Sequence, residues 1–200
     1  MLQVRRLGDT AFRIERPAGL DARCLFERAR AWPAVIDAVV TERHVAVYFA
    51  AATELQDAWL ASLAAPSEAS LATAREHVIA VVYDGPDLDD VAARAGLRPR
   101  EVIAAHQSAL YEVAMMGFQP GFAYLTGLSA RLVLPRRETP RTRVPAGSVA
   151  IGGRYAGVYP FASPGGWHLL GRAVGAPLFD SERGARLAVG DRVRFKQEAK

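Results

Sequence analysis

Short runs in which apolar and polar residues alternate dominate the first eighty residues, and two segments between them have helical spacing. Residues 2–7 and 11–15 flank a Gly-Asp turn and predict two strands. Residues 21–31 predict a helix with Leu25 and Ala29 turned inward, together with Cys24. This part of the chain therefore mixes strands and helices.

The pattern continues with two β-rich runs, residues 35–40 and 44–49, whose short connection favours a hairpin. The sequence TELQ at 53–56 is a capping-box pattern and predicts that a helix follows. A further helix over 68–74 is an option, and residues 77–83 are a strongly apolar strand. The order βαββαβ is that of a ferredoxin-like α+β domain, here over residues 1–84.

The second half has a different pattern. Residues 87–95 predict a short helix that Asp87 caps and Gly96 ends, and residues 99–108 predict another. Short apolar runs punctuated by Gly and Pro then follow at 111–116, 131–134, 148–151, 157–159, 167–173 and 191–195. Such spacing favours a β-barrel or sandwich with long loops, placed at residues 85–200.

Composition narrows the function classes. Half of the 200 residues are hydrophobic, and 25 basic against 21 acidic residues give a net charge of +4, too small a bias to suggest a nucleic-acid partner. Cys24 is the only cysteine, which excludes an intrachain disulfide and a Cys-rich metal site. Neither a signal peptide nor a membrane-spanning run is evident, so a cytoplasmic protein with no membrane partner is expected.

The familiar catalytic signatures are missing: the sequence contains no GxxxxGK[ST], GxGxxG, HExxH, CxxC or GxSxG motif. No metal site is predicted. Three segments nevertheless combine backbone-fixing Gly and Pro with aromatic or cationic side chains. They are MMGFQPGFAYLTGL (115–128), RETPRTRVPAGSVAIGG (137–153) and PFASPGGWHLLGR (160–172).

The second of these segments is expected to hold a negatively charged group. Arginine offers a planar fork of donors for carboxylates and phosphates, so Arg141 and Arg143 are candidate anion contacts, with Ser148 beside them. Pairing of either arginine with a protein carboxylate is an equally good interpretation. Arg136 and Arg137 are expected to be solvated.

Other candidates come from the aromatic residues and histidines. His106 follows the apolar face of a predicted helix and is either a catalytic base or a core histidine; Arg143 is the other catalytic candidate. Trp167 and His168 are neighbours, one facing in and one out, and Tyr124 is a candidate ligand contact. These three complete the predicted substrate site.

The three segments, with LFD and a closing GDRVRF, resemble the bacterial family that contains the B subunit of 5-oxoprolinase, the kinase inhibitor KipI and allophanate hydrolase subunit 1, a half of the carboxyltransferase domain. The resemblance covers about residues 80–200. Ala123 and Thr126 depart from the family's usual Pro and Gly. The resemblance implies an N-terminal α+β domain and a C-terminal cyclophilin-like β-barrel.

The same resemblance implies a function. It suggests that the chain is one component of an ATP-dependent enzyme that opens 5-oxo-L-proline to L-glutamate. The substrate would be a small anion, and the chain would be inactive by itself. The implied partners are a KipA-like protein and a LamB/YcsF-like protein, and whether this chain itself contacts ATP stays open. The alternatives are a KipI-like histidine-kinase inhibitor and half of a biotin-dependent carboxyltransferase.

Overall fold

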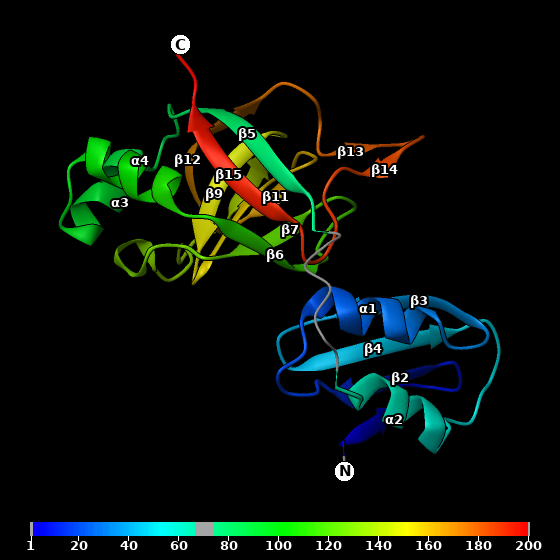
Figure 1. Cartoon of the computed structure of the whole chain (residues 1–200). Helices are drawn as coiled ribbons and strands as arrows, with labels where there is room; N and C mark the ends of the chain where they lie inside the picture. The colour runs from blue at the N-terminus through cyan, green and yellow to red at the C-terminus, as the bar shows by residue number, and fades with distance from the viewer. Residues whose placement is uncertain (1, 67–73, 200) are drawn as a thin grey trace. The chain divides into compact units, whose positions relative to one another are not determined.

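The structure is a computed structural model and describes residues 2–66 and 74–199. The chain divides into two compact units, Met1–Ala74 and Arg75–Lys200 (Figure 1). The optional helix at 68–74 falls almost entirely outside the described residues.

The N-terminal unit is a four-stranded sheet with two helices. Its strands have the order β1-β2-β4-β3, and all neighbours are antiparallel. The elements are β1 (Val4–Arg6), β2 (Ala11–Glu15), α1 (Ala22–Arg30), β3 (Val35–Val40), β4 (His44–Phe49) and α2 (Asp57–Ala64). The predicted hairpin of residues 35–49 is confirmed.

The two helices begin differently. Helix α1 starts after Asp21, whose carboxylate accepts a hydrogen bond from the backbone N–H of Cys24 at 2.8 Å, a standard N-cap. Helix α2 starts at Asp57, later than the TELQ pattern predicted. The hydroxyl of Thr53 donates to the carbonyl of Ala51, so it caps no helix. The capping-box prediction was therefore wrong in position.

The strand expected to complete a ferredoxin-like fold belongs to the other unit. Strand β5 (Glu76–Val82) pairs in parallel with β15 (Arg192–Gln197) and antiparallel with β12 (His168–Val174). The ferredoxin-like arrangement is not confirmed, because its last strand is missing from the N-terminal sheet. The expected boundary after residue 84 assigned this strand to the first domain, whereas the structure assigns it to the second.

The C-terminal unit is a closed barrel with the strand order β10-β7-β6-β15-β5-β12-β9, β9 pairing back with β10. The remaining barrel strands are β6 (Tyr111–Met116), β7 (Ala123–Thr126), β9 (Ser148–Gly152) and β10 (Tyr155–Val158). The predicted barrel is thus confirmed. Helices α3 (Leu88–Ala95) and α4 (Pro99–Ser108) form as expected, but they lie between the barrel strands β5 and β6 and do not precede the barrel. Gly96 ends α3 with φ 63°.

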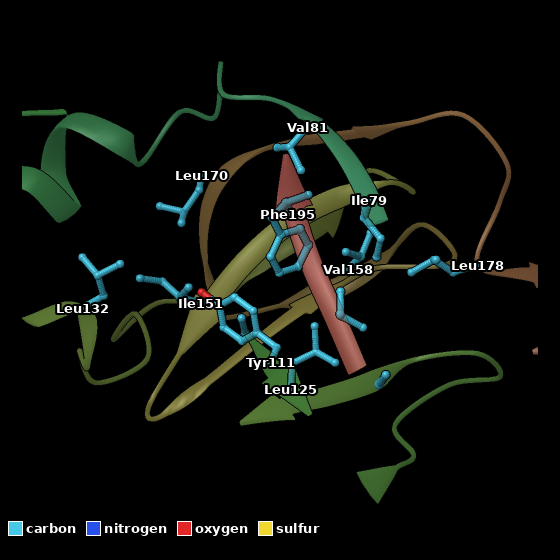
Figure 2. Packing of buried hydrophobic residues seen from close by; sticks show 14 of the residues in the cluster. Ile79, Val81, Tyr111, Leu125, Leu132, Ile151, Val158, Leu170, Leu178 and Phe195 are labelled. Atoms are coloured by element: carbon cyan, nitrogen blue, oxygen red, sulfur yellow. The ribbon is translucent and has the colours of Figure 1, made fainter. Parts of the chain in front are cut away.

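Alternating side chains from the barrel strands fill its interior. Val113, Ile151 and Val193 are fully buried, and Figure 2 shows Tyr111, Val158 and Phe195 grouped between the strands. Tyr111 and Phe195 meet edge to face with ring centroids 5.2 Å apart. The barrel is therefore a packed core and not an open channel.

Short elements outside the barrel complete the unit. The apolar run 131–134 is not a strand: it overlaps a 3-10 helix (Ala130–Leu132), and Leu134 makes an isolated bridge to Gly153. Two small sheets join β8 (Arg141–Val144) to β11 (Ser163–Gly165), and β13 (Phe179–Asp180) to β14 (Gly184–Ala185). The β8–β11 pair brings the second and third sequence segments together.

Candidate functional site

The three Gly- and Pro-rich segments converge on one pocket of the barrel unit, with a volume of about 250 Å³. The first segment contributes aromatic rings, and the other two contribute a rim of Pro and Gly with a tryptophan. The lining residues are Phe118, Phe122, Tyr124, Arg136, Pro140, Tyr159, Pro164, Gly165, Gly166 and Trp167. An aromatic pocket with few polar groups is typical of small-molecule sites.

Two glycines make room for the ring of Trp167 in the pocket. A Cβ on Gly152 would lie 2.7 Å from the ring of Trp167, and one on Gly157 would lie 3.2 Å from the same ring. Trp167 also contacts the ring of Phe122 edge to face, with centroids 5.4 Å apart. The indole therefore lies against strands β9 and β10 because both have a glycine beneath it.

Phe118 is held at the pocket in a strained conformation. Its φ is 72°, a value that non-glycine residues rarely adopt, and its side chain is among the exposed large hydrophobic groups. The ring contacts Phe122 and Tyr159 edge to face. Backbone strain of this kind costs about 1–3 kcal/mol and clusters at functional sites, so Phe118 belongs to the candidate site.

Tyr159 supplies the pocket with a neutral hydroxyl. Burial raises the pKa of Tyr159, although a hydrogen bond from the Trp167 backbone and the charge of Arg136 oppose the shift. The phenol therefore keeps its proton at neutral pH and can donate it in a hydrogen bond. A Cβ on Gly165 would lie 2.4 Å from the Tyr159 hydroxyl oxygen, so only glycine leaves room there.

Arg136 is the cation of the pocket. Its guanidinium carbon lies 5.9 Å from the Trp167 ring centroid, in cation–π range. The backbone next to it is fixed, because the N–H of Arg137 donates to the carbonyl of Gly166 at 2.8 Å. Arg136 was expected to be merely solvated. Sequence reasoning missed both Arg136 and Phe118, although Phe118 lies within the first Gly- and Pro-rich segment and Arg136 directly precedes the second.

Behind the rim lies a buried ion cluster. Asp87 Oδ1 accepts from Arg141 Nη2 at 2.7 Å and from Arg137 Nη1 at 2.9 Å, while Oδ2 accepts from the Leu169 N–H at 2.7 Å. Asp87 is only 3% exposed. Burial raises the pKa of this carboxyl, but the hydrogen bonds from Arg141 and Leu169 and the two arginine charges outweigh it and lower the pKa.

This cluster changes the interpretation of two predictions. Asp87 was expected to cap α3, but its side chain makes no capping hydrogen bond. Arg141 was a candidate anion contact, and in the structure its anion is Asp87 of the same chain. Two guanidinium nitrogens, Arg137 Nε and Arg141 Nη1, are buried with no hydrogen-bond partner among the described residues.

The other predicted contacts lie outside the pocket. Arg143 is exposed on β8, and within residues 2–66 and 74–199 its side chain makes no hydrogen bond or ion pair. Ser148 is buried in β9. His168 is fully buried, and its Nε2–H donates to the carbonyl of Pro135 at 2.9 Å. Of the predicted substrate contacts, the pocket contains Tyr124 and Trp167.

His106, one of the two catalytic candidates, is a core residue. Its ring is fully buried, with its centroid 4.4 Å from that of the Phe195 ring, and Nδ1 is hydrogen-bonded to the Tyr83 hydroxyl at 2.7 Å. Burial lowers the pKa of His106 to about 3. A neutral imidazole inside the barrel core is not exposed to substrate.

Two findings concern metals and membranes. Within the described ranges, no three His, Cys, Asp or Glu side chains gather in a way that would hold a metal ion. Nor, in that same part of the chain, does any helix combine the length and the apolar character needed to cross a bilayer.

The chain belongs to the family described as carboxyltransferase domain, subdomain C and D, whose model matches residues 2–188. Its similar relatives include the 5-oxoprolinase B subunit of Haemophilus influenzae, 49% identical over 126 residues (60% of this chain, 59% of the relative). The 5-oxoprolinase B subunit of Bacillus subtilis is 46% identical over 112 residues (56% and 47%). The chain thus spans about half to three fifths of these relatives.

Solved structures agree with the family. The match to the crystal structure of TTHA0988 covers 99% of this chain and 41% of the TTHA0988 chain, with a TM-score of 0.79 and 36% sequence identity. The match to the crystal structure of PH0987 from Pyrococcus horikoshii, a conserved uncharacterized protein, covers 98% of this chain and 97% of the PH0987 chain, with a TM-score of 0.59 and 30% sequence identity. The Kluyveromyces lactis urea carboxylase matches 99% and 22%, with a TM-score of 0.72; at 17% identity it supports the fold alone.

Proposed function

We propose that this chain is the B subunit of an ATP-dependent 5-oxoprolinase, which opens 5-oxo-L-proline to L-glutamate. A KipA-like protein and a LamB/YcsF-like protein complete the enzyme, and the isolated chain is inactive. The relatives' names motivate the reaction. The observation that carries the proposal is the aromatic pocket with one arginine, because 5-oxoproline is a small flat ring with one carboxylate.

The substrate fits the pocket by chemistry. Its five-membered ring packs against Trp167 and Phe122, and its carboxylate pairs with the guanidinium of Arg136. The protonated hydroxyl of Tyr159 donates to the lactam oxygen. Such a hydrogen bond polarises the lactam, a poor electrophile that needs activation by ATP before water attacks.

The site differs from the one expected from the sequence. The sequence predicted Arg143 as an anion contact and Arg136 as a solvated residue, whereas Arg136 lines the pocket and Arg143 does not. We therefore expect Arg136→Ala to raise the KM for 5-oxoproline about tenfold, which corresponds to about 1.5 kcal/mol for one charge-assisted hydrogen bond. Arg143→Ala is the matched control, an exposed arginine nearby in the chain, and should leave KM unchanged.

The test is ATP-dependent glutamate release by the reconstituted complex of all three proteins. Release that requires every one of them supports the proposal, and its absence from the complete complex would refute it. Equal effects of Arg136→Ala and Arg143→Ala would refute the placement of the substrate in this pocket. The kinase-inhibitor and carboxyltransferase alternatives have no specific observation in their favour.

A further inference from the structure

The N-terminal unit has a pocket of its own, with a volume of about 520 Å³. It lies where β1, the end of β2 and the start of β4 meet. Four arginines line it (Arg5, Arg13, Arg16 and Arg43), together with His44 and one acid, Glu15. With the histidine neutral, four positive charges and one negative charge leave a local charge of +3. No function proposed above uses this surface.

The strands contribute four of these side chains, from Arg5, Arg13, Glu15 and His44, and these lie on the sheet face that the helices leave open. Phe12, Ile14 and Phe49 are buried on the other face, where Phe49 stacks on Trp59 of helix α2. Because successive residues of a strand point to opposite faces, Arg13 points away from the helices. Arg13 and its cross-strand partner Arg5 therefore face out of the domain core.

Two of the arginines are direct neighbours across the sheet. Arg5 on β1 pairs in register with Arg13 on β2. Like charges directly opposite each other destabilise a sheet, unless a counter-charge separates them. In the described part of the chain neither Arg5 nor Arg13 makes an ion pair. Arg6, which follows Arg5 in β1, does pair with Glu54, at 3.0 Å.

A third arginine is fixed in place. Arg16 donates from Nη1 to the carbonyl of Thr41 at 3.0 Å and from Nη2 to that of Leu20 at 2.9 Å. Its backbone N–H also donates to the carbonyl of Arg43 at 2.8 Å. These bonds hold the Arg16 guanidinium in position before any ligand binds. Such preorganisation lowers the entropic cost of binding.

We propose that this pocket binds the oligophosphate group of a small molecule, as carried by a nucleoside triphosphate. Arginine forks match phosphate oxygens in a bidentate way, and a chain of phosphates can contact Arg5 and Arg13 at once. The bound anion would also neutralise the like-charge pair. The inference is independent of the oxoprolinase proposal, because it concerns binding by this chain without partner proteins.

The test is calorimetric titration of the full chain at low salt with tripolyphosphate, ATP and adenosine. We expect tripolyphosphate and ATP to bind, and adenosine to fail, with affinity falling as salt screens the charges. The double variant Arg5→Gln/Arg13→Gln should weaken binding about tenfold or more, the loss of at least one charge-assisted hydrogen bond. Arg30→Gln, an exposed arginine at the end of α1, should bind as the parent does.

The outcomes separate clearly. Tripolyphosphate binding without ATP binding would support the phosphate site and identify its ligand as one that is not a nucleotide. Failure of both anions to bind would overturn the proposal, as would binding unaffected by the double variant or equally weakened by Arg30→Gln. Unfolding by urea serves as the folding control: loss of the like-charge pair should leave the double variant at least as stable as the parent.

Discussion

The carboxylate of Asp87 and the guanidinium of Arg141 form an ion pair at 2.7 Å between residues 54 positions apart. The pair connects the start of α3 to β8 and thereby fixes the backbone that carries Pro140 on the pocket rim. Because Arg137 shares the same carboxylate oxygen, one buried acid holds two cations.

Replacement of Asp87 should destabilise the barrel unit. Asp87→Asn keeps the side-chain shape but leaves two partly buried guanidinium groups without a counter-charge, so we expect the free energy of unfolding to fall by about 3 kcal/mol. Asp89→Asn, an exposed acid in the first turn of the same helix, should cost far less. Urea unfolding curves test this, and equal losses in both variants would contradict it.

The same carboxyl makes stability depend on pH in the acid range. Its pKa in the folded protein lies below the ordinary value of 3.8. The stabilisation is therefore present above pH 3.8 and is lost as pH falls through the folded pKa. Asp87→Asn should flatten this part of the stability–pH curve, measured by urea unfolding between about pH 2.5 and 5. An unchanged acid limb would contradict the prediction.

His106 should produce a second, separate pH dependence. Its pKa is about 3 in the folded protein and 6.5 as an ordinary histidine, so between these values only the unfolded chain binds the proton. Stability should therefore fall as pH drops from 6.5 toward 3, by up to about 1.4 kcal/mol per pH unit. The slope should be flatter in His106→Gln and unchanged in His44→Gln. Melting temperatures of both variants from about pH 4 to 7 test this.

Gly152 and Gly166 should respond differently to a single added methyl group. Gly152→Ala places a Cβ 2.7 Å from the Trp167 ring, while the nearest atoms to a Cβ on Gly166 are 3.7 Å away. We expect Gly152→Ala to cost about 1–3 kcal/mol of stability by overpacking and to weaken 5-oxoproline turnover. Gly166→Ala should be close to neutral in thermal unfolding, and the reverse order would contradict the structure.

Phe118 offers a test of backbone strain. At φ 72° glycine is unstrained and alanine is not, so Phe118→Gly should be more stable than Phe118→Ala by about 1 kcal/mol. This reverses the order usual at other exposed positions. Both variants lose the aromatic ring, so their difference in chemical denaturation reports the backbone alone. An Ala variant at least as stable as the Gly variant would contradict the strain.

Local patterns predicted most elements of the chain. The helix at Pro99–Ser108 and the hairpin of β3 and β4 follow from side-chain periodicity and turn residues, which act within a few positions of each other. The sequence also singled out the three Gly- and Pro-rich segments as candidate ligand contacts, and residues from all three line one pocket. Which of their side chains line the pocket could not be predicted, because that depends on how distant strands pair.

Local sequence patterns account for the individual helices and strands and for the segments that combine Gly and Pro with aromatic or cationic residues. The tertiary structure decided that β5 pairs with β15, that Asp87 meets Arg141, and that His106 is buried. Each depends on residues far apart in the chain, whose meeting is set by the packing of the whole barrel. A buried carboxylate or imidazole looks the same in the sequence as an exposed one, because burial is a property of the fold.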